Sequence, residues 1–205
     1  MWRYDKDHRE RILPALRDYE DKLAMINKGY YFAYGRDHSE RPIVYFDARK
    51  WLDTKIDIHD MFKTVDITLS YLIYNALIPG KIENYHVIID MENIGLTEFP
   101  INWVRMIALH VRDGYFARCA SLSFVNVPYL VKALSKIIFA IVDDFQGSKM
   151  YVFKQDFNPK LKKSLGFENI EKSYGGYLPK KTSDYFPPRL SERRENPKKK
   201  KKVAK

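Results

Sequence analysis

Acidic side chains in two places have the type and spacing of a carboxylate pair. Asp90 follows the apolar stretch 86–89, with Glu92 two residues later, and Asp143 is followed directly by Asp144. Two carboxylates in one cleft can divide acid and base roles between them, so either pair could serve catalysis. Carboxylates at the ends of helices and strands also act as caps and turn formers, and that alternative stays open for both pairs.

The other residue types that commonly act in catalysis stand without motif partners. The five histidines are scattered, with no pair at metal-ligand spacing: His8, His38, His59, His86 and His110. We interpret them as surface residues or hydrogen-bonded core residues. Cys119 is the only cysteine, which excludes an intramolecular disulfide and fits a reducing compartment. No Gly-x-Ser-x-Gly turn, glycine-rich phosphate loop or His-Glu-x-x-His pair is present. The sequence therefore predicts a protein that is not an enzyme and has no metal site or cofactor.

The composition predicts one globular domain with a large apolar interior. Hydrophobic residues make up 45% of the 205, and aromatic residues 15%, with 15 Tyr and 12 Phe. The longest apolar run covers residues 137–142, too short to span a bilayer, which needs about 20 residues. The N-terminus has no apolar signal region. We therefore expect a cytoplasmic protein whose membrane contact is peripheral, with the nucleus or an organellar assembly as the alternative.

Most of the net charge of +10 lies at the C-terminal end. Residues 189–205 carry nine basic and two acidic side chains, so they hold +7 and the rest of the chain about +3. The centre of this tail is a run of five lysines: Lys198, Lys199, Lys200, Lys201 and Lys202. Such a run could act as a nuclear import signal, bind an anionic membrane, grip RNA or an acidic protein surface, or simply be solvated.

Hydrophobic periodicity and breakers predict alternating strands and helices. We expect helices over residues 1–27, 57–77, 100–115, 128–144 and 158–165, and strands over 30–34, 41–47, 86–90, 121–127 and 150–153. The first two strands read as a hairpin closed by the turn 35–40. This order predicts an α/β fold with a mixed, largely parallel sheet flanked by helices.

The expected helix over residues 128–144 is unusual because residues 137–142 are apolar on every side. Such a helix is either buried on both faces or a lid, with one face on the core and the other on a lipid or membrane.

Several short motifs, in this order, resemble the CRAL-TRIO family of lipid-binding domains, which includes yeast-type phosphatidylinositol transfer proteins. They are Gly35–Ile43, Ile88–Met91 with Gly95, Tyr115–Arg118, Asn126–Pro128, Ser148–Lys149, Leu165–Phe167 and Tyr174–Gly176. The resemblance covers about residues 30–180. Glu40 stands where the family pattern usually has glycine.

The resemblance implies a sheet that forms the floor of a deep apolar pocket, closed by residues 128–144 as a gating helix. It divides the chain into an N-terminal helix (1–29), the lipid-binding domain (30–187) and the basic tail (188–205), with most of the family's N-terminal helical domain missing. The expected pocket and gate residues are Tyr71, Tyr74, Ile89, Trp103, Ile107, Leu134, Ile137, Ile138 and Ile141.

For the lipid head group, the resemblance points to Arg118 and Lys149, which match cationic positions of the phosphatidylinositol-binding members. Ala117 replaces the acid expected beside Arg118. Tyr85 and Val87 replace the polar side chains that hold a choline lipid. Phosphoinositide recognition is thus half supported and phosphatidylcholine recognition is not.

Two hypotheses follow. In the first, the protein binds, and transfers or senses, a phospholipid or another small hydrophobic ligand at membranes. In the second, it is a non-enzymatic structural or adaptor subunit on a degenerate CRAL-TRIO fold, whose tail grips an acidic protein partner or RNA.

Overall fold

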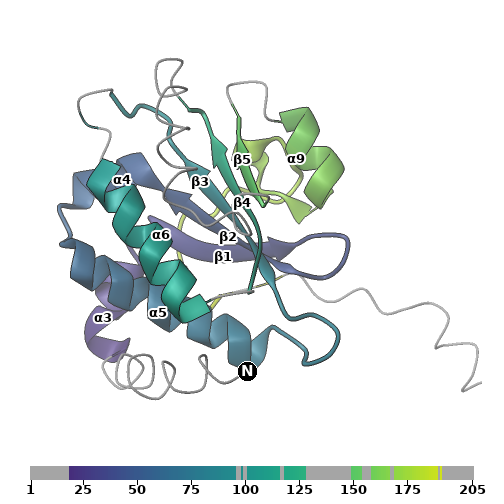
Figure 1. Ribbon diagram of the computed structural model, residues 1–205, viewed down its shortest axis with the longest axis horizontal. Helices are drawn as coiled ribbons and strands as arrows, with labels where there is room; N and C mark the ends of the chain where they lie inside the picture. Colours follow the sequence, from purple (N-terminus) through teal and green to yellow (C-terminus); the bar gives the residue numbers. More distant parts are fainter. Residues whose placement is uncertain are drawn as a thin grey trace, which may run out of the picture.

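The computed structural model describes residues 19–95, 98, 101–115, 118–127, 149–153, 158–166, 169–188 and 190. These residues form a five-stranded sheet with helices on both faces (Figure 1). The elements are α3 (Tyr19–Ile26), β1 (Tyr31–Arg36), β2 (Pro42–Asp47), α4 (Ala48–Thr54), α5 (Ile58–Asn75), β3 (Tyr85–Asp90), α6 (Ile101–Tyr115), β4 (Cys119–Val125), β5 (Met150–Val152), α9 (Asn158–Leu165) and the 3-10 helix η4 (Lys172–Tyr174).

The strands lie in chain order, β1-β2-β3-β4-β5. The hairpin β1–β2 is antiparallel, and β2, β3, β4 and β5 pair in parallel. The prediction of a mixed, largely parallel sheet is therefore confirmed. In the register, Val44 is the partner of Val87, and Val87 the partner of Leu122. Since side chains alternate along a strand, these three lie on one face of the sheet.

The hairpin turn is built around Asp37, whose carboxylate accepts hydrogen bonds from the backbone N–H groups of Ser39 and Arg41, both at 2.8 Å. Glu40 has φ of 65° in this turn. The left-handed region costs a residue with a side chain roughly 1–2 kcal/mol, which gives the physical reason for the glycine in the family pattern. The first strand runs to Arg36, two residues beyond the expected end, because Gly35 carries it through an irregularity in the ladder.

Helix α5 forms where the sequence predicted a helix over residues 57–77, but it begins at residue 58 and ends at residue 75. Asp57 caps its N-terminus by accepting from His59 N at 2.8 Å, and Met61, Val65, Leu69 and Leu72 bury one face. The other expected strands and helices within the described residues occur within two residues of their predicted ends. For the first expected helix, only the part within α3 is described. The expected helix over 128–144 and the basic tail lie outside the described residues.

Helix α4 was not predicted. It follows β2 directly, is capped by Asp47, which accepts from Lys50 N at 2.8 Å, and ends at Lys55 with φ of 54°. Only Ala48 and Trp51 of its seven residues are buried, so it gives almost no periodic signal.

Each face of the sheet has its own core. On one face, which we call the helix side, side chains from α4, α5 and α6 pack on β1, β2, β3 and β4. On the opposite face, Leu161 and Leu165 of α9 pack on the sheet together with Tyr174 and Tyr185. Figure 1 shows α5 and α6 across the one face and α9 against the other.

Candidate functional site

The centre of the sheet on the helix side is not fully covered. Val44 of β2 is fully buried, but its register partner Val87 on β3 and the next partner, Leu122 on β4, are only half-buried. Val152 of β5 is half-buried as well. Inner strands of a parallel sheet that is covered on both faces normally bury their side chains. The side chains at the centre of β3 and β4 are therefore partly accessible on this side, and we call this part of the sheet the hollow.

Three of the expected pocket residues lie together on the helix side. Ile89 and Trp103 are each 4% exposed within its core, and Ile107, one turn further along α6, is half-buried against the same core. Tyr71 instead packs edge-on against Phe186, and Tyr74 is 58% exposed. Leu134, Ile137, Ile138 and Ile141 lie outside the described residues.

Polar groups are buried between α5 and α6. The Tyr115 hydroxyl donates to Asp66 Oδ1 at 2.6 Å, and His110 Nε2 lies 2.8 Å from the same oxygen. Phe62 stacks on the His110 ring at 4.3 Å. Burial, together with the charge of Asp66, holds the pKa values of Tyr115 and Tyr31 well above the usual range. Both phenols are therefore neutral hydroxyl groups inside the protein.

The two expected head-group cations lie at one edge of the sheet, where β4 and β5 begin. Arg118 Nη1 donates to the carbonyl of Glu83 at 3.0 Å, and Lys149 Nζ donates to the carbonyl of Cys119 at 3.4 Å. Burial raises the pKa of the Cys119 thiol to about 12, so it is not a nucleophile at neutral pH. Ala117, which stands in place of the expected acid, lies outside the described residues.

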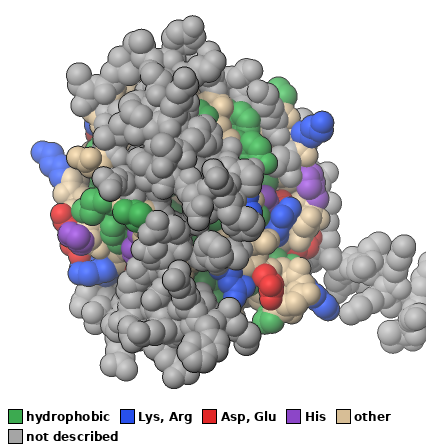
Figure 2. All heavy atoms as spheres, in the orientation of Figure 1, with side chains coloured by type: hydrophobic (Ala, Val, Ile, Leu, Met, Phe, Trp, Pro, Cys, Tyr) green, Lys and Arg blue, Asp and Glu red, His purple; other side chains and the backbone are tan. Residues whose placement is uncertain are grey.

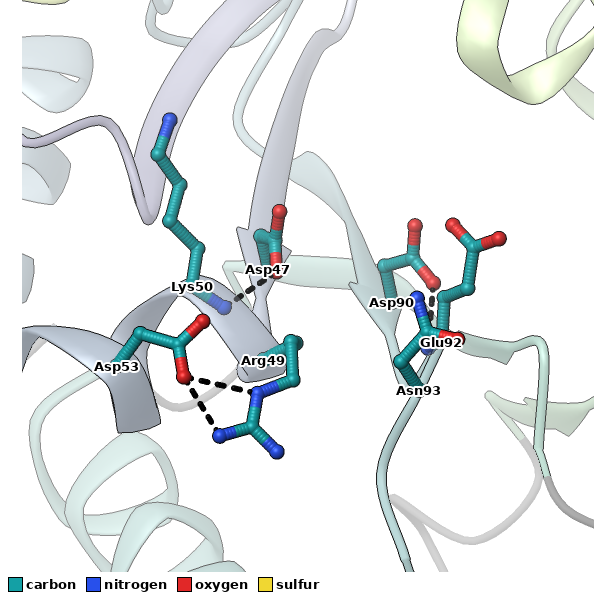
Figure 3. A pocket seen from close by; sticks show the side chains of 7 residues that line it. All are labelled: Asp47, Arg49, Lys50, Asp53, Asp90, Glu92 and Asn93. Carbon is teal, nitrogen blue, oxygen red and sulfur yellow. Dashed lines mark hydrogen bonds and ion pairs between the residues drawn. The ribbon is translucent and has the colours of Figure 1, made fainter.

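A polar pocket of about 240 Å³ opens at the opposite edge of the sheet (Figure 3). Asp47 and Asp90, register partners at the ends of β2 and β3, line it. The other lining residues come from α4 and from the turn after β3: Arg49, Lys50, Asp53, Glu92 and Asn93. Figure 3 shows the Arg49 guanidinium turned onto Asp53.

The charged groups of this pocket are engaged with one another and with the backbone. Arg49 bonds Asp53 at 2.6 Å and Glu98 at 3.0 Å. Asp90 Oδ1 accepts from Asn126 Nδ2 at 2.8 Å and from the N–H of Glu92 at 2.9 Å. Asp90 thus stabilises a turn, which is the second of the two alternatives, catalysis or turn formation, that the sequence left open for it. The pair Asp143–Asp144 lies outside the described residues.

Burial raises the pKa of Asp47, and the negative charge of Asp90 beside it raises this pKa further. Among the described residues, no group of three or more His, Cys, Asp or Glu side chains could hold a metal ion.

A buried network on the face opposite the helix side joins the hairpin to β3 and β4. His86 Nδ1 lies 2.5 Å from Ser121 Oγ, and His86 Nε2 lies 2.9 Å from Asp37 Oδ2. Asp37 also pairs with Arg41 at 2.8 Å. These are the residue types of a catalytic triad, but Ser121 is only 7% exposed and the Asp37 side chain is fully buried. The network ties three strands together. Sequence reasoning anticipated a hydrogen-bonded core histidine here but not its partners, which are 35 and 49 residues away.

Charged side chains do not gather into one patch on the face drawn in Figure 2. Among the described residues, blue and red side chains are scattered around the rim of this view. This scatter is consistent with the charge count from the sequence, in which the residues before the C-terminal tail carry little of the net charge.

A mixed, largely parallel sheet with helices on both faces and partly accessible inner strands defines the class of protein as an α/β domain. Comparison with known families gives the particular one: residues 26–176 match the model of the CRAL/TRIO domain. The chain therefore belongs to the CRAL/TRIO family, whose members bind lipids or other small hydrophobic ligands.

Known relatives agree with this assignment. Clavesin-1 of Xenopus laevis is 24% identical over 147 residues, and clavesin-2 of Mus musculus is 22% identical over 146. These matches cover 70% of the chain but only 43% and 44% of the clavesins, so the chain spans less than half of their length. The crystal structure of Sfh5 has a TM-score of 0.62 at 13% identity, over 87% of this chain and 70% of that one. Its likeness confirms the fold.

Proposed function

We propose that this protein binds one phospholipid, or a hydrophobic ligand of similar size, in the hollow, and exchanges it with membranes. The observation that carries the proposal is the half-burial of Val87 and Leu122 at the centre of the sheet. An acyl chain laid over them would gain roughly 0.8 kcal/mol for each methylene removed from water.

Exchange of such a ligand requires a segment of the protein that opens to admit and release it. We propose the segment 128–144, outside the described residues, as the gate, because its run 137–142 is apolar on every side and could contact the ligand or a bilayer. In the described part of the chain, no helix has the length and apolar character needed to cross a bilayer. The proposed membrane contact is accordingly peripheral, on the cytoplasmic side, and the lysine tail would strengthen it by about 1 kcal/mol per charge near anionic lipid.

Lipid identification is the direct test. Mass spectrometry of lipid extracted from the purified full chain should find about one phospholipid per protein, and that lipid should exchange with liposomes. Protein without lipid would refute the carrier function. It would favour the second candidate, a structural or adaptor subunit, to which the basic tail points.

Two substitutions at one position test whether the hollow is the binding site. Val87→Phe should fill the space and abolish lipid loading while the protein stays folded, whereas Val87→Ala should keep the lipid. Val44→Phe, at the neighbouring buried position, should instead cost about 1–3 kcal/mol of stability in urea unfolding, because no space is open there. Unchanged lipid loading of Val87→Phe would place the ligand elsewhere.

We further propose that Arg118 and Lys149 bind an anionic head group. The double variant Arg118→Ala/Lys149→Ala should weaken binding of phosphatidylinositol about tenfold or more, since charge-assisted hydrogen bonds are worth roughly 1.5–3 kcal/mol. Lys163→Ala is the matched control, because Lys163 is exposed on α9, against the opposite face of the sheet. Equal affinity of the double variant and the control would refute the head-group assignment.

A further inference from the structure

One surface loop near the end of the described residues combines basic and hydroxyl side chains. Its sequence is Lys180-Lys181-Thr182-Ser183, followed by Asp184. Residues 179–185 have no regular secondary structure, and Thr182, Ser183 and Asp184 are exposed. Another protein that approaches this surface can therefore reach both hydroxyl side chains.

The loop is fixed at both ends. At its start, the backbone N–H of Lys181 donates to Glu171 Oε2 at 3.3 Å. At its end, Tyr185 is 4% exposed in the core of the face opposite the helix side, and its N–H donates to Asn27 Oδ1 at 3.2 Å. The exposed residues 182–184 lie between these two anchored positions, so the fold presents them at a defined place on the surface.

The hydroxyl group of Ser183 is only weakly engaged. Its Oγ donates to Asp184 Oδ2 at 3.5 Å, whereas an O–H···O hydrogen bond normally measures roughly 2.5–3.0 Å. By contrast, the hydroxyls of Thr64 and Thr68 are buried in α5 and donate to backbone carbonyls at 2.7 Å and 2.9 Å. A reaction at Ser183 Oγ therefore requires neither unfolding nor the loss of a strong hydrogen bond.

The structure distinguishes Ser183 from another exposed serine that has a basic residue three positions before it. Ser39 follows Arg36 at that spacing. Arg36 is only 5% exposed, however, and its guanidinium donates to the carbonyl of Glu40 at 2.7 Å. A protein that binds at Ser39 could not reach this charge. Lys180, three residues before Ser183, is exposed.

The second lysine, Lys181, is held by a weak contact. It is half-buried, with its Nζ 5.6 Å from the centre of the Tyr34 ring. A cation–π contact near the protein surface is weak, so a carboxylate of another protein can compete for the ammonium group. Ser183 thus has lysines two and three residues before it, whereas Thr182 has Pro179 at the third position.

The spacing of these lysines determines which kind of protein recognises the loop. One class of protein kinases binds its substrates in an extended form and pairs its own carboxylates with basic side chains two and three residues before the acceptor hydroxyl. Such charge patterns give kinases much of their specificity. Residues 179–182 form neither helix nor turn, so the loop can bind in an extended form.

We infer that Ser183 is a phosphorylation site for a protein kinase that recognises lysines two and three residues before its acceptor. Ser183 Oγ forms a bond to the γ-phosphorus of ATP, the bond from that phosphorus to the β–γ bridging oxygen breaks, and ADP leaves. The hydroxyl proton passes to the catalytic base of the kinase. The phosphate changes the net charge of residues 180–184 from +1, two lysines and one aspartate, to about −1. The inference does not depend on the proposed lipid binding.

A kinase assay on the folded protein tests the inference. The purified full chain is incubated with ATP and the catalytic subunit of cyclic-AMP-dependent protein kinase, which recognises this charge pattern. Tandem mass spectrometry then locates the phosphorylated residues. Ser183 should carry a phosphate, whereas Thr182 and Ser39 should not. Phosphorylation should be lost at this loop in Ser183→Ala.

A matched pair of double variants tests the role of the lysines. Lys180→Ala/Lys181→Ala should slow phosphorylation of Ser183 about tenfold or more, because two charge-assisted contacts with the kinase are lost. Lys163→Ala/Lys172→Ala removes two exposed lysines outside the loop and should leave the rate unchanged. Equal rates for the two double variants would overturn recognition through Lys180 and Lys181.

Two further outcomes would overturn the assignment of Ser183 itself. The first is a full chain without phosphate on Ser183 under conditions in which a synthetic peptide of residues 177–187 is phosphorylated, because the fold would then shield the loop. The second is a phosphate on Thr182 in place of Ser183, because the acceptor would then lie one residue closer to the lysines.

Discussion

Asp37 should make the stability of this fold depend on pH in the acid range. Its side chain is fully buried and bonds Arg41 Nε at 2.8 Å, while His86 Nε2 lies 2.9 Å away. Burial alone would raise the pKa of Asp37. The hydrogen bonds from His86 and from the backbone of Arg41, with the charges of both residues, outweigh burial and lower the pKa from 3.8 to about 2.

The size and sign of the effect follow from this pKa. A carboxyl group whose pKa is lower in the folded protein contributes stability that is fully present above pH 3.8 and is lost as the pH falls through about 2. At about 1.4 kcal/mol for each pKa step, ionised Asp37 contributes about 2 kcal/mol. Asp37→Asn removes this contribution and leaves Arg41 with a weaker partner.

Urea unfolding followed by tryptophan fluorescence measures the effect. The wild type should exceed Asp37→Asn in free energy of unfolding by a constant amount at pH 5 to 7. The gap should shrink by about 2 kcal/mol as the pH is lowered toward 2. Asp184→Asn controls for the loss of an exposed carboxylate. A gap between wild type and Asp37→Asn that does not change with pH would show that the network does not hold Asp37 ionised.

Two more predictions concern packing and burial. A Cβ on Gly176 would overlap the carbonyl oxygen of Ile170, so Gly176→Ala should lower the free energy of unfolding by more than Gly80→Ala, where only the positive φ opposes a side chain. Equal losses in urea unfolding would contradict the closeness of these two backbone segments. Tyr115→Phe removes a hydrogen bond to a buried carboxylate and should cost about 1.5–3 kcal/mol, against about 1 kcal/mol for Tyr30→Phe, whose partner is a neutral hydroxyl. The reverse order in thermal or urea unfolding would refute the greater strength of the hydrogen bond from Tyr115 to Asp66.

The sequence predicted part of the packing on the helix side and missed part of it, while the assignment of these residues to a ligand pocket stays a prediction. Ile89, Trp103 and Ile107 were expected in the pocket, and the structure gathers them on the helix side, because apolar periodicity identifies the buried face of a helix or strand. Tyr74 was expected there too but is exposed, since an aromatic residue near the end of a helix can point either way without changing the pattern. Helix α4, with Trp51, was not predicted because it gives almost no periodic signal.

The sequence by itself determined the class of fold. Alternating apolar segments of strand and helix length, separated by breakers, require a largely parallel sheet with helical cover, and the order of short motifs pointed to the CRAL-TRIO family. These are properties of neighbouring residues, so they can be read along the chain.

Only the tertiary structure decided which distant side chains meet. It joined Asp37 to His86 and Ser121, stacked Trp51 on Trp103, and left Val87 half-buried beside the fully buried Val44. Val44 and Val87 are the same residue type, each in an apolar strand, and are indistinguishable in the sequence. The difference lies in what packs over them, because burial depends on how helices from other parts of the chain cover the sheet.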